Sequence, residues 1–399
     1  MKYTWPLSVS SFDLWDKLQV AWFILSSDRY TMGENVTKLE NELVTRISGV
    51  YDSPIYCLLT SSGSTAISLL FESWRQLNPD FYKRTVVIGP SVTWSTSIGI
   101  PILAGFRVRL CDINRHDFSF NYHKLEKIVK NEKSKGNHVI LWPTSLLGYQ
   151  PSKFQLESLA RQYNCNLWMD CAENQGGVDS SGHSILSSYD NTITSMYFSH
   201  FIQGLELGAF FTKDKRMYEM ALCVRNHGMT RHLDNNSALK KKFLQQNKTI
   251  DPNFLFAYLG NNYRPIELSA LFARLDKKRW FEYTETRIKL FKLFYGLLNK
   301  ELFYKTSDIN EPHVPFALPL FAKSEDIYNK AKLICKENNV ETRAFVGSNL
   351  LRQPAFRHLG DYRSFPVSEL IHKQAFYIGL YSKLKEEQVI KLAGQLNKL

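Results

Sequence analysis

The sequence predicts an α/β protein built on a mostly parallel sheet. Short apolar runs typical of buried strands alternate with stretches in which apolar residues recur at helical spacing, and this alternation favours parallel strands joined by helices. We expect the strands at 55–59, 85–88, 107–112, 138–143, 167–170 and 193–199. Hydrophobic residues make up 44% of the 399 residues, which indicates a folded chain long enough for two domains that share a cleft.

Two amphipathic helices are expected in the first 50 residues. Ser10 or Ser11 can cap the first, whose apolar face contains Leu14, Leu18, Ala21, Trp22 and Leu25. The second has an apolar face of Val36, Leu39, Leu43, Val44 and Ile47. The N-terminal segment has no apolar signal-peptide region, and no apolar run reaches the ~20 residues that span a bilayer, so we expect a cytoplasmic protein.

A cluster of serine, threonine and glycine follows the first predicted strand. In the segment SSGSTA, Gly63 permits a tight turn and Ser64 opens a helix. Free amides at a helix start, together with nearby hydroxyls, can hold a phosphate group. Similar clusters cap many helices that bind no ligand, so both interpretations stay open on the residues alone.

Two ionisable side chains are expected at one edge of the sheet. Asp170 ends the predicted strand 167–170, and a buried carboxylate is costly unless a cation or several donors meet it. His200 follows the apolar run 193–199. The two residues could form two walls of a small-molecule site, although a histidine in this position can also be a hydrogen-bonded core residue.

The segment 167–212 resembles the cofactor-binding core of the pyridoxal-phosphate-dependent sugar aminotransferases that act on nucleotide-linked keto sugars, the DegT/StrS-like family. In that family the strand-end aspartate pairs with the pyridine nitrogen, a lysine forms the Schiff base, and a glutamate follows six residues later. Glu206 lies six residues after His200, so His200 occupies the lysine position. This exchange marks a subgroup, the nucleotide-sugar 3-dehydratases. The resemblance is most specific at SSGSTA, the Trp94 loop, DCAE and FSHFIQGLELG.

The resemblance implies the aspartate-aminotransferase-like fold, which is fold type I of the pyridoxal-phosphate enzymes. It predicts a large cofactor-binding domain at 1–250, with a mostly parallel seven-stranded sheet. A small α+β C-terminal domain with an interface helix would then occupy 251–399. The polar, lysine-rich residues 231–256 suggest a flexible connection between the domains, and one helix is expected from 267 to about 298.

Site residues carry over from the family position by position. The implied cofactor-binding residues are Gly63, Ser64, Trp94, Asp170, Glu173, Ser195 and Asn262, the last reaching the phosphate in a partner subunit. The implied substrate-binding residues are Thr31, Met32, Arg343 and Arg352, and His200 would be catalytic. On composition alone Trp94 could be a core residue and the two arginines solvated surface. The implied partners are a nucleotide sugar, glutamate and a second copy in a homodimer with shared active sites, with no nucleic acid and no membrane.

The cysteine spacing and the net charge indicate which metals and acidic ligands the protein could bind. The six cysteines include no CxxC pair, so buried free thiols are favoured over a metal site, an iron–sulfur cluster or disulfides. The formal net charge of +12 could attract an acidic ligand such as a nucleotide diphosphate, or it could be a solvated basic surface. No basic stretch is interleaved with aromatic residues in a nucleic-acid-binding pattern.

The family's chemistry implies a specific reaction. Glutamate would convert pyridoxal phosphate to pyridoxamine phosphate, which would then allow loss of the C3 hydroxyl from a GDP-linked 4-keto-6-deoxyhexose, with His200 as base and then acid. Two alternatives remain: an aminotransferase that uses a histidine base, and a non-catalytic binder of a nucleotide sugar or acidic polymer. Phe201 and Leu207, where close relatives have histidine and glycine, favour the last alternative.

Overall fold

The computed structural model describes residues 3–48, 54–179, 182–304, 306 and 314–399. Within these residues a seven-stranded sheet has the strand order β1-β7-β6-β5-β4-β2-β3. Strands β2 to β6 pair in parallel, and β7 runs antiparallel to both of its neighbours, β6 and β1. The predicted α/β fold with a mostly parallel seven-stranded sheet is therefore confirmed. The strands are β1 (Tyr56–Thr60), β2 (Thr85–Pro90), β3 (Arg107–Cys111), β4 (His138–Leu141), β5 (Asn166–Asp170), β6 (Asn191–Ser195) and β7 (Gly208–Thr212).

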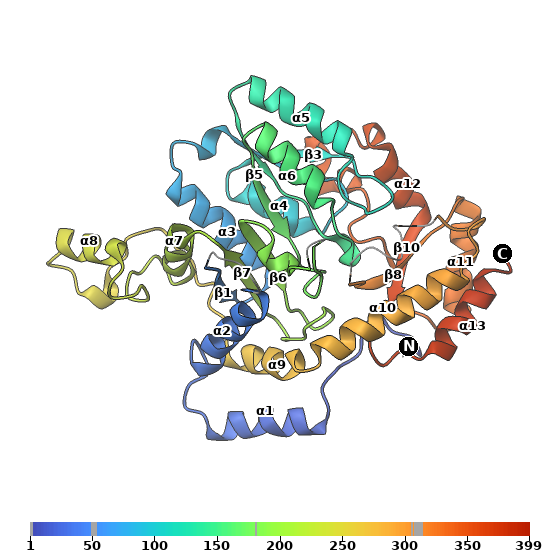
Figure 1. Cartoon of the computed structure of the whole chain (residues 1–399), viewed down its shortest axis with the longest axis horizontal. Helices are drawn as coiled ribbons and strands as arrows, with labels where there is room; N and C mark the ends of the chain where they lie inside the picture. The colour runs from blue at the N-terminus through green and yellow to red at the C-terminus, as the bar shows by residue number, and fades with distance from the viewer. Residues whose placement is uncertain (1–2, 49–53, 180–181, 305, 307–313) are drawn as a thin grey trace.

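Helices surround this sheet on both faces (Figure 1). Strands β2, β6 and β7 are buried along their whole length, as expected for central strands covered on two sides. Several helices start where the sequence supplies a side-chain cap; Ser62 and Thr65, for example, form a capping box at the start of α3. The surrounding helices are α2 (Glu34–Ser48), α3 (Gly63–Leu77), α4 (Ser95–Leu103), α5 (Tyr122–Ser134), α6 (Lys153–Gln162), α7 (Lys215–Arg225) and α9 (Glu267–Lys277).

A second core lies at the C-terminal end of the chain. Its three-stranded antiparallel sheet has the order β8-β10-β9, and Trp5 from the N-terminal segment packs into the same core, where its Nε1 donates to Gly379 O at 2.9 Å. The elements are α10 (Trp280–Leu297), β8 (Ala317–Phe321), α11 (Glu325–Glu337), β9 (Thr342–Ala344), α12 (Pro366–Gln374), β10 (Ala375–Gly379) and α13 (Glu386–Leu396). This is the small α+β unit that the sequence predicts.

Packing locates the transition between the two units. Helix α9 packs against α2, and Ala270 and Ala273 belong to a core cluster of the large unit. Trp280 and Tyr283, at the start of α10, belong to that same cluster, whereas Leu290 and Phe294 belong to the second core. The division at residues 250 and 251 stays a prediction, and this packing favours a transition within α10.

Three sequence-based expectations about element limits are wrong. The strand expected to run to residue 199 ends at Ser195, because its partner β7 begins opposite it at Gly208. The helix expected at 267–298 is broken between α9 and α10, where Arg279 leaves helical geometry. The cap of α1 (Leu14–Ser26) is Asp13, not Ser10 or Ser11, since the Asp13 carboxylate accepts from the Asp16 amide.

The segment 231–256 is not a connection between domains. The segment leaves the large unit after Thr230, and its far end returns to the same place on that unit. There the Thr230 amide donates to Leu255 O at 3.2 Å, and Met229 forms a β-bridge with Phe256. Between these points it contains α8 (Ala238–Gln246), which projects from the body of the molecule (Figure 1). The low apolar content that suggested a linker instead reflects a helix with no buried residue.

Candidate active site

A cavity of about 290 Å³ lies at the edge of the sheet where the parallel strands end. Side chains from both units line it. It brings together the predicted site residues Gly63, Ser64, Trp94, Asp170, Glu173, Ser195, His200 and Arg343. Carboxyl ends of parallel strands are the usual ligand-binding edge of an open α/β sheet.

The start of α3 forms one end of this cavity. The amides of Gly63 and Ser64 have no acceptor among the described residues, as is typical of the first turn of a helix. A Cβ atom on Gly63 would lie 2.6 Å from Ser195 Cβ, so only glycine lets α3 approach the end of β6 this closely. Two free amides beside the hydroxyls of Ser64 and Ser195 fit an anionic group such as a phosphate.

Asp170 forms a second wall. Its side chain is buried, and the Ser97 hydroxyl donates to Oδ2 at 2.5 Å while the Ala172 amide donates to Oδ1 at 3.0 Å. Burial raises the pKa of the Asp170 carboxyl, and these two hydrogen bonds oppose the shift. No lysine or arginine among the described residues forms an ion pair with it. A buried carboxylate without a cation fits a ligand that brings its own positive N–H group.

His200 lies on the loop after β6 and not at a strand end. Its Nδ1 is 2.7 Å from Ala172 O and 3.1 Å from Ser195 O. Carbonyl oxygens only accept, so Nδ1 must carry the hydrogen and Nε2 keeps its lone pair. Burial lowers the pKa of His200 to about 4, although the two carbonyl hydrogen bonds act in the opposite direction. The imidazole is therefore a neutral base at neutral pH.

Glu173 and the second unit complete the cavity. The Leu147 amide donates to Glu173 Oε2 at 2.6 Å, and burial raises the pKa of this carboxyl to about 7. From the second unit, the Phe316 ring lies 5.3 Å from the His200 ring in an edge-on arrangement. Arg343, also on the second unit, is opposite Tyr377 in the β9–β10 register. Among the described lining residues Arg343 is the permanent cation, and no lysine is present.

Sequence reasoning missed several of these residues. Ser97, which holds Asp170, lies three residues after Trp94 in a run of serines and threonines, and that run was a usable signal. Phe316 and Tyr377 have no local signal, because only tertiary packing brings the second unit to the cavity.

Four predicted site residues lie outside the lining of this cavity. Thr31 forms a bridge with Ile266, while Asn262 Oδ1 accepts from Arg264 Nε at 2.8 Å. Arg352 forms an ion pair with Glu369 at 2.6 Å. The roles assigned to Thr31, Met32, Asn262 and Arg352 stay predictions, and the role of Asn262 requires a partner subunit.

Phe201 and Leu207, the two residues that depart from the family pattern, do not fill the cavity. Phe201 is buried, with its ring 5.5 Å from the Trp280 ring, and it does not line the cavity. Leu207 is also buried and has no positive φ; the left-handed residue of this loop is Leu205, with φ of 61°. Neither side chain occupies the space between Asp170 and His200.

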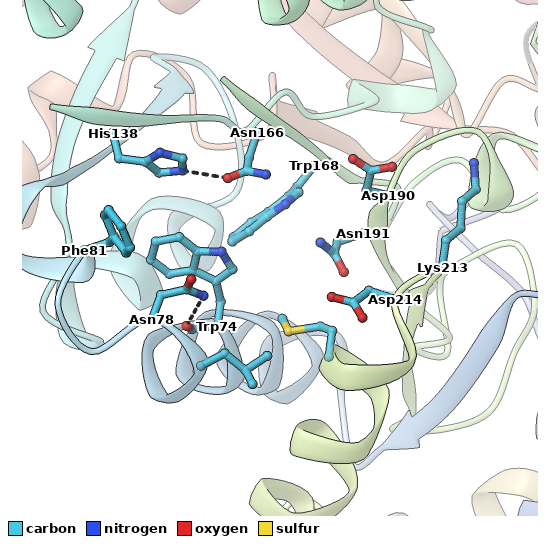
Figure 2. A pocket seen from close by; sticks show the side chains of 12 residues that line it. Trp74, Asn78, Phe81, His138, Asn166, Trp168, Asp190, Asn191, Lys213 and Asp214 are labelled. Carbon is cyan, nitrogen blue, oxygen red and sulfur yellow. Dashed lines mark hydrogen bonds between the residues drawn. The ribbon is translucent and has the colours of Figure 1, made fainter. Parts of the chain in front are cut away.

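A larger cavity of about 510 Å³ lies at the opposite edge of the sheet (Figure 2). Its lining includes His138, Asn166 and Asn191, which begin β4, β5 and β6. Trp74 stacks on His138 with ring centroids 5.6 Å apart. This cavity lacks the predicted site residues, so its greater size does not make it the candidate active site.

The described residues contain neither a metal-binding cluster nor a membrane-spanning helix. No cluster of three or more histidine, cysteine, aspartate or glutamate side chains is placed to hold a metal ion. The six cysteines are free, and five of them are buried. No helix in the described part of the chain has the length and apolarity to cross a bilayer.

Comparison with known proteins identifies the family. The model of the DegT/DnrJ/EryC1/StrS aminotransferase family matches residues 16–397. The chain belongs to this family. Among its curated relatives, a GDP-4-keto-6-deoxy-D-mannose 3-dehydratase of Yersinia pseudotuberculosis is 27% identical over 98% of both chains. One of Escherichia coli is 24% identical over 94% of this chain and 95% of the relative.

Solved structures confirm the aminotransferase fold of this family member. The Escherichia coli 3-dehydratase with bound hydrated pyridoxal phosphate is similar at a TM-score of 0.88, with 22% identity and coverage of 99% of this chain and 100% of that one. A second 3-dehydratase structure, which holds pyridoxal phosphate joined to glutamate, has a TM-score of 0.86, 21% identity and coverage of 98% and 100%. The Helicobacter pylori aminotransferase of pseudoaminic acid biosynthesis has a TM-score of 0.81, 15% identity and coverage of 100% and 99%.

Proposed function

We propose that the protein is a 3-dehydratase of a GDP-linked 4-keto-6-deoxyhexose that uses pyridoxal and pyridoxamine phosphate as coenzyme. One observation carries the proposal: a neutral histidine and a buried aspartate share one cavity whose described lining contains no lysine. An aminotransferase needs a lysine to hold its coenzyme covalently and to release an amino sugar. Both curated relatives named above are 3-dehydratases of the same GDP sugar.

The residues of the cavity have distinct tasks in this proposal. Gly63, Ser64 and Ser195 bind the coenzyme phosphate through amides and hydroxyls, and Asp170 keeps the pyridine nitrogen protonated. The exposed Trp94 provides a flat face for the ring. When bound, the coenzyme supplies an electron sink.

His200 moves the proton. Its Nε2 lone pair can accept a proton in the cavity, since Nδ1–H is held by Ala172 O and Ser195 O. The same nitrogen can then deliver that proton to the departing C3 hydroxyl, which leaves as water. The overall reaction converts glutamate and the keto sugar to 2-oxoglutarate, ammonia and a 3-deoxy-4-keto sugar.

A homodimer with shared active sites is part of the proposal. Four apolar residues of α1 face away from the described chain with 51% to 81% of their surface exposed: Leu14, Leu18, Trp22 and Leu25. Figure 1 shows α1 set apart from the body, below α9. A second copy would cover this face and would supply Asn262 to the neighbouring coenzyme phosphate.

The decisive experiment incubates the purified protein with pyridoxal phosphate, glutamate and GDP-4-keto-6-deoxymannose. We expect 2-oxoglutarate, ammonia and a nucleotide sugar that has lost one oxygen. A stable amino sugar in the mass spectrum would instead establish an aminotransferase. Failure to bind either coenzyme form, judged by the absorbance spectrum, would support a non-catalytic member of the family.

A further inference from the structure

The buried side chain of Gln175 joins both ends of the loop that carries His200. Its Nε2 donates to Ser195 O at 2.5 Å, and its Oε1 accepts from the Ile202 amide at 2.7 Å. The loop between these points contains His200, and the Gln175 amide closes its base together with the Gly204 amide, which donates to Met196 O at 2.8 Å. Both of these hydrogen bonds of Gln175 join it to backbone groups, so neither involves a charge.

The carbonyl of Ser195 connects Gln175 to the histidine. This oxygen accepts from Gln175 Nε2 and also from His200 Nδ1. The other acceptor of His200, Ala172 O, lies three residues before Gln175 on the same segment after β5. Both carbonyls that select the imidazole tautomer are therefore held by the segment 172–175.

We propose that Gln175 is a positioning residue, which fixes His200 with Nδ1–H toward the backbone and Nε2 toward the cavity. This inference deepens the proposed function and rests on it for the catalytic consequence. The strand ends at Ser195, and beyond it the Met196 amide donates to Leu207 O at 2.8 Å and the Phe198 amide to Leu205 O at 3.0 Å. These bonds hold the loop backbone and do not reach the imidazole. Without the bond from Gln175, the Ser195–Met196 peptide would still be held by the Met196 amide, which donates to Leu207 O at 2.8 Å, but Ser195 O would be held less firmly and the competing tautomer would become more accessible.

Local packing explains why a glutamine amide fits this position. The next residue, Gly176, lies against Phe201, and a Cβ atom there would lie 3.2 Å from Phe201 Cζ. The segment thus passes close beneath the His200 loop, and a side chain with one donor and one acceptor satisfies both buried backbone groups.

The variant Gln175→Glu tests the hydrogen bond that Gln175 Nε2 donates to Ser195 O, because it keeps the acceptor oxygen for the Ile202 amide. A protonated carboxyl has the same shape, donates to Ser195 O and accepts from Ile202 N–H, whereas the carboxylate has no donor and repels Ser195 O. Burial favours the protonated form at low pH, and His200 stays neutral down to a pKa of about 4. We expect kcat to be close to wild type at pH 5 and to fall about 10- to 100-fold at pH 8, with KM changing much less.

Gln203→Glu is the matched control. Gln203 is a buried amide that directly follows Ile202, but its side chain bonds Ser11 and Val9 and forms no hydrogen bond with Ser195 or Ile202. We expect its kcat to follow the wild-type pH profile. An equal alkaline loss in both variants, or a Gln175→Glu profile parallel to wild type, would overturn the proposal.

A second readout needs neither coenzyme nor turnover. In the apoprotein labelled with ¹⁵N-histidine, the signal of His200 is assigned by its absence in His200→Asn. We expect the Nδ1–H tautomer in wild type and a mixture of tautomers in Gln175→Met, with circular dichroism and thermal melting to check folding. An unchanged tautomer would refute the role of Gln175, whereas a wild-type protein that fails to dehydrate the GDP sugar would refute only the proposed function. If Gln175→Met does not fold, the same spectrum of Gln175→Glu at pH 5 and pH 8 decides.

Discussion

Asp170 is a buried carboxyl group that pairs with no described cation, and burial raises its pKa. We expect Asp170→Asn to keep the hydrogen bond with Ser97 but to lower kcat about 100-fold, because the amide cannot hold the pyridine nitrogen protonated. Steady-state kinetics checks this, with Asp190→Asn in the opposite cavity as a control that should change kcat less than about twofold. A near-normal rate for Asp170→Asn would remove the carboxylate from the mechanism.

The lowered pKa of His200 makes the unfolding free energy of the protein depend on pH in the acid range. Its pKa is lowered from 6.5 to about 4 in the folded chain, so between these values the unfolded chain binds a proton that the folded chain does not. Stability from this group is present above pH 6.5 and is lost as the pH falls to 4, by at most about 3 kcal/mol.

We therefore expect the apoprotein of His200→Asn to lose less unfolding free energy than wild type between pH 7 and pH 4.5. Urea denaturation at the two pH values measures the difference. Equal losses in the two proteins would mean that His200 is solvated and titrates normally.

At the scale of elements, α1 has most of its apolar face uncovered. We expect Trp22→Glu to convert a dimer to a monomer, because the introduced charge would have to be buried against the second copy. Light scattering after size exclusion measures the mass. The exposed Phe154 on α6 provides the control Phe154→Glu, which should leave the dimer intact. A dimer that survives in Trp22→Glu would place the interface elsewhere.

A partly buried ion pair joins α2 to α7 and bonds to β1 between them. Arg225 Nη1 lies 2.6 Å from Glu40 Oε1 and donates to Leu59 O at 2.8 Å, while the Leu59 amide donates to the same Glu40 oxygen. Arg225→Leu should lower the unfolding free energy by about 3 kcal/mol, since it leaves a partly buried carboxylate unpaired. Chemical denaturation tests this, and the double variant with Glu40→Leu should recover part of the loss. A loss below about 1 kcal/mol would show that the pair is dispensable.

Helices and strands could be predicted from the sequence where the spacing of nearby apolar residues alone determines them. The face of Val36, Leu39, Leu43 and Ile47 is buried as its helical spacing predicts. The loop of His200 was not predictable, because the apolar residues after Ser195 continue the strand pattern although the strand has ended. Which residues of the second unit reach the cavity depends on packing across more than 100 residues of chain, so no local pattern encodes Phe316 or Tyr377.

For the whole molecule, the cavity is lined by both units, so a ligand there should stabilise both cores together. At a concentration 100 times its dissociation constant, pyridoxamine phosphate should raise the unfolding free energy by about 2.7 kcal/mol. Calorimetry should then show one transition moving to higher temperature. A separate transition that the ligand leaves in place would mean that the second unit unfolds independently of the site.

The free cysteines allow the rate of transient unfolding of the native chain to be measured by thiol alkylation. Only Cys165 is partly accessible, and burial raises the pKa of its thiol to about 11, so even this residue alkylates slowly. The other five thiols meet a reagent only in molecules that have transiently unfolded. The number of alkyl groups per molecule, measured over time by intact mass spectrometry, would therefore give the rate of transient unfolding without an introduced label.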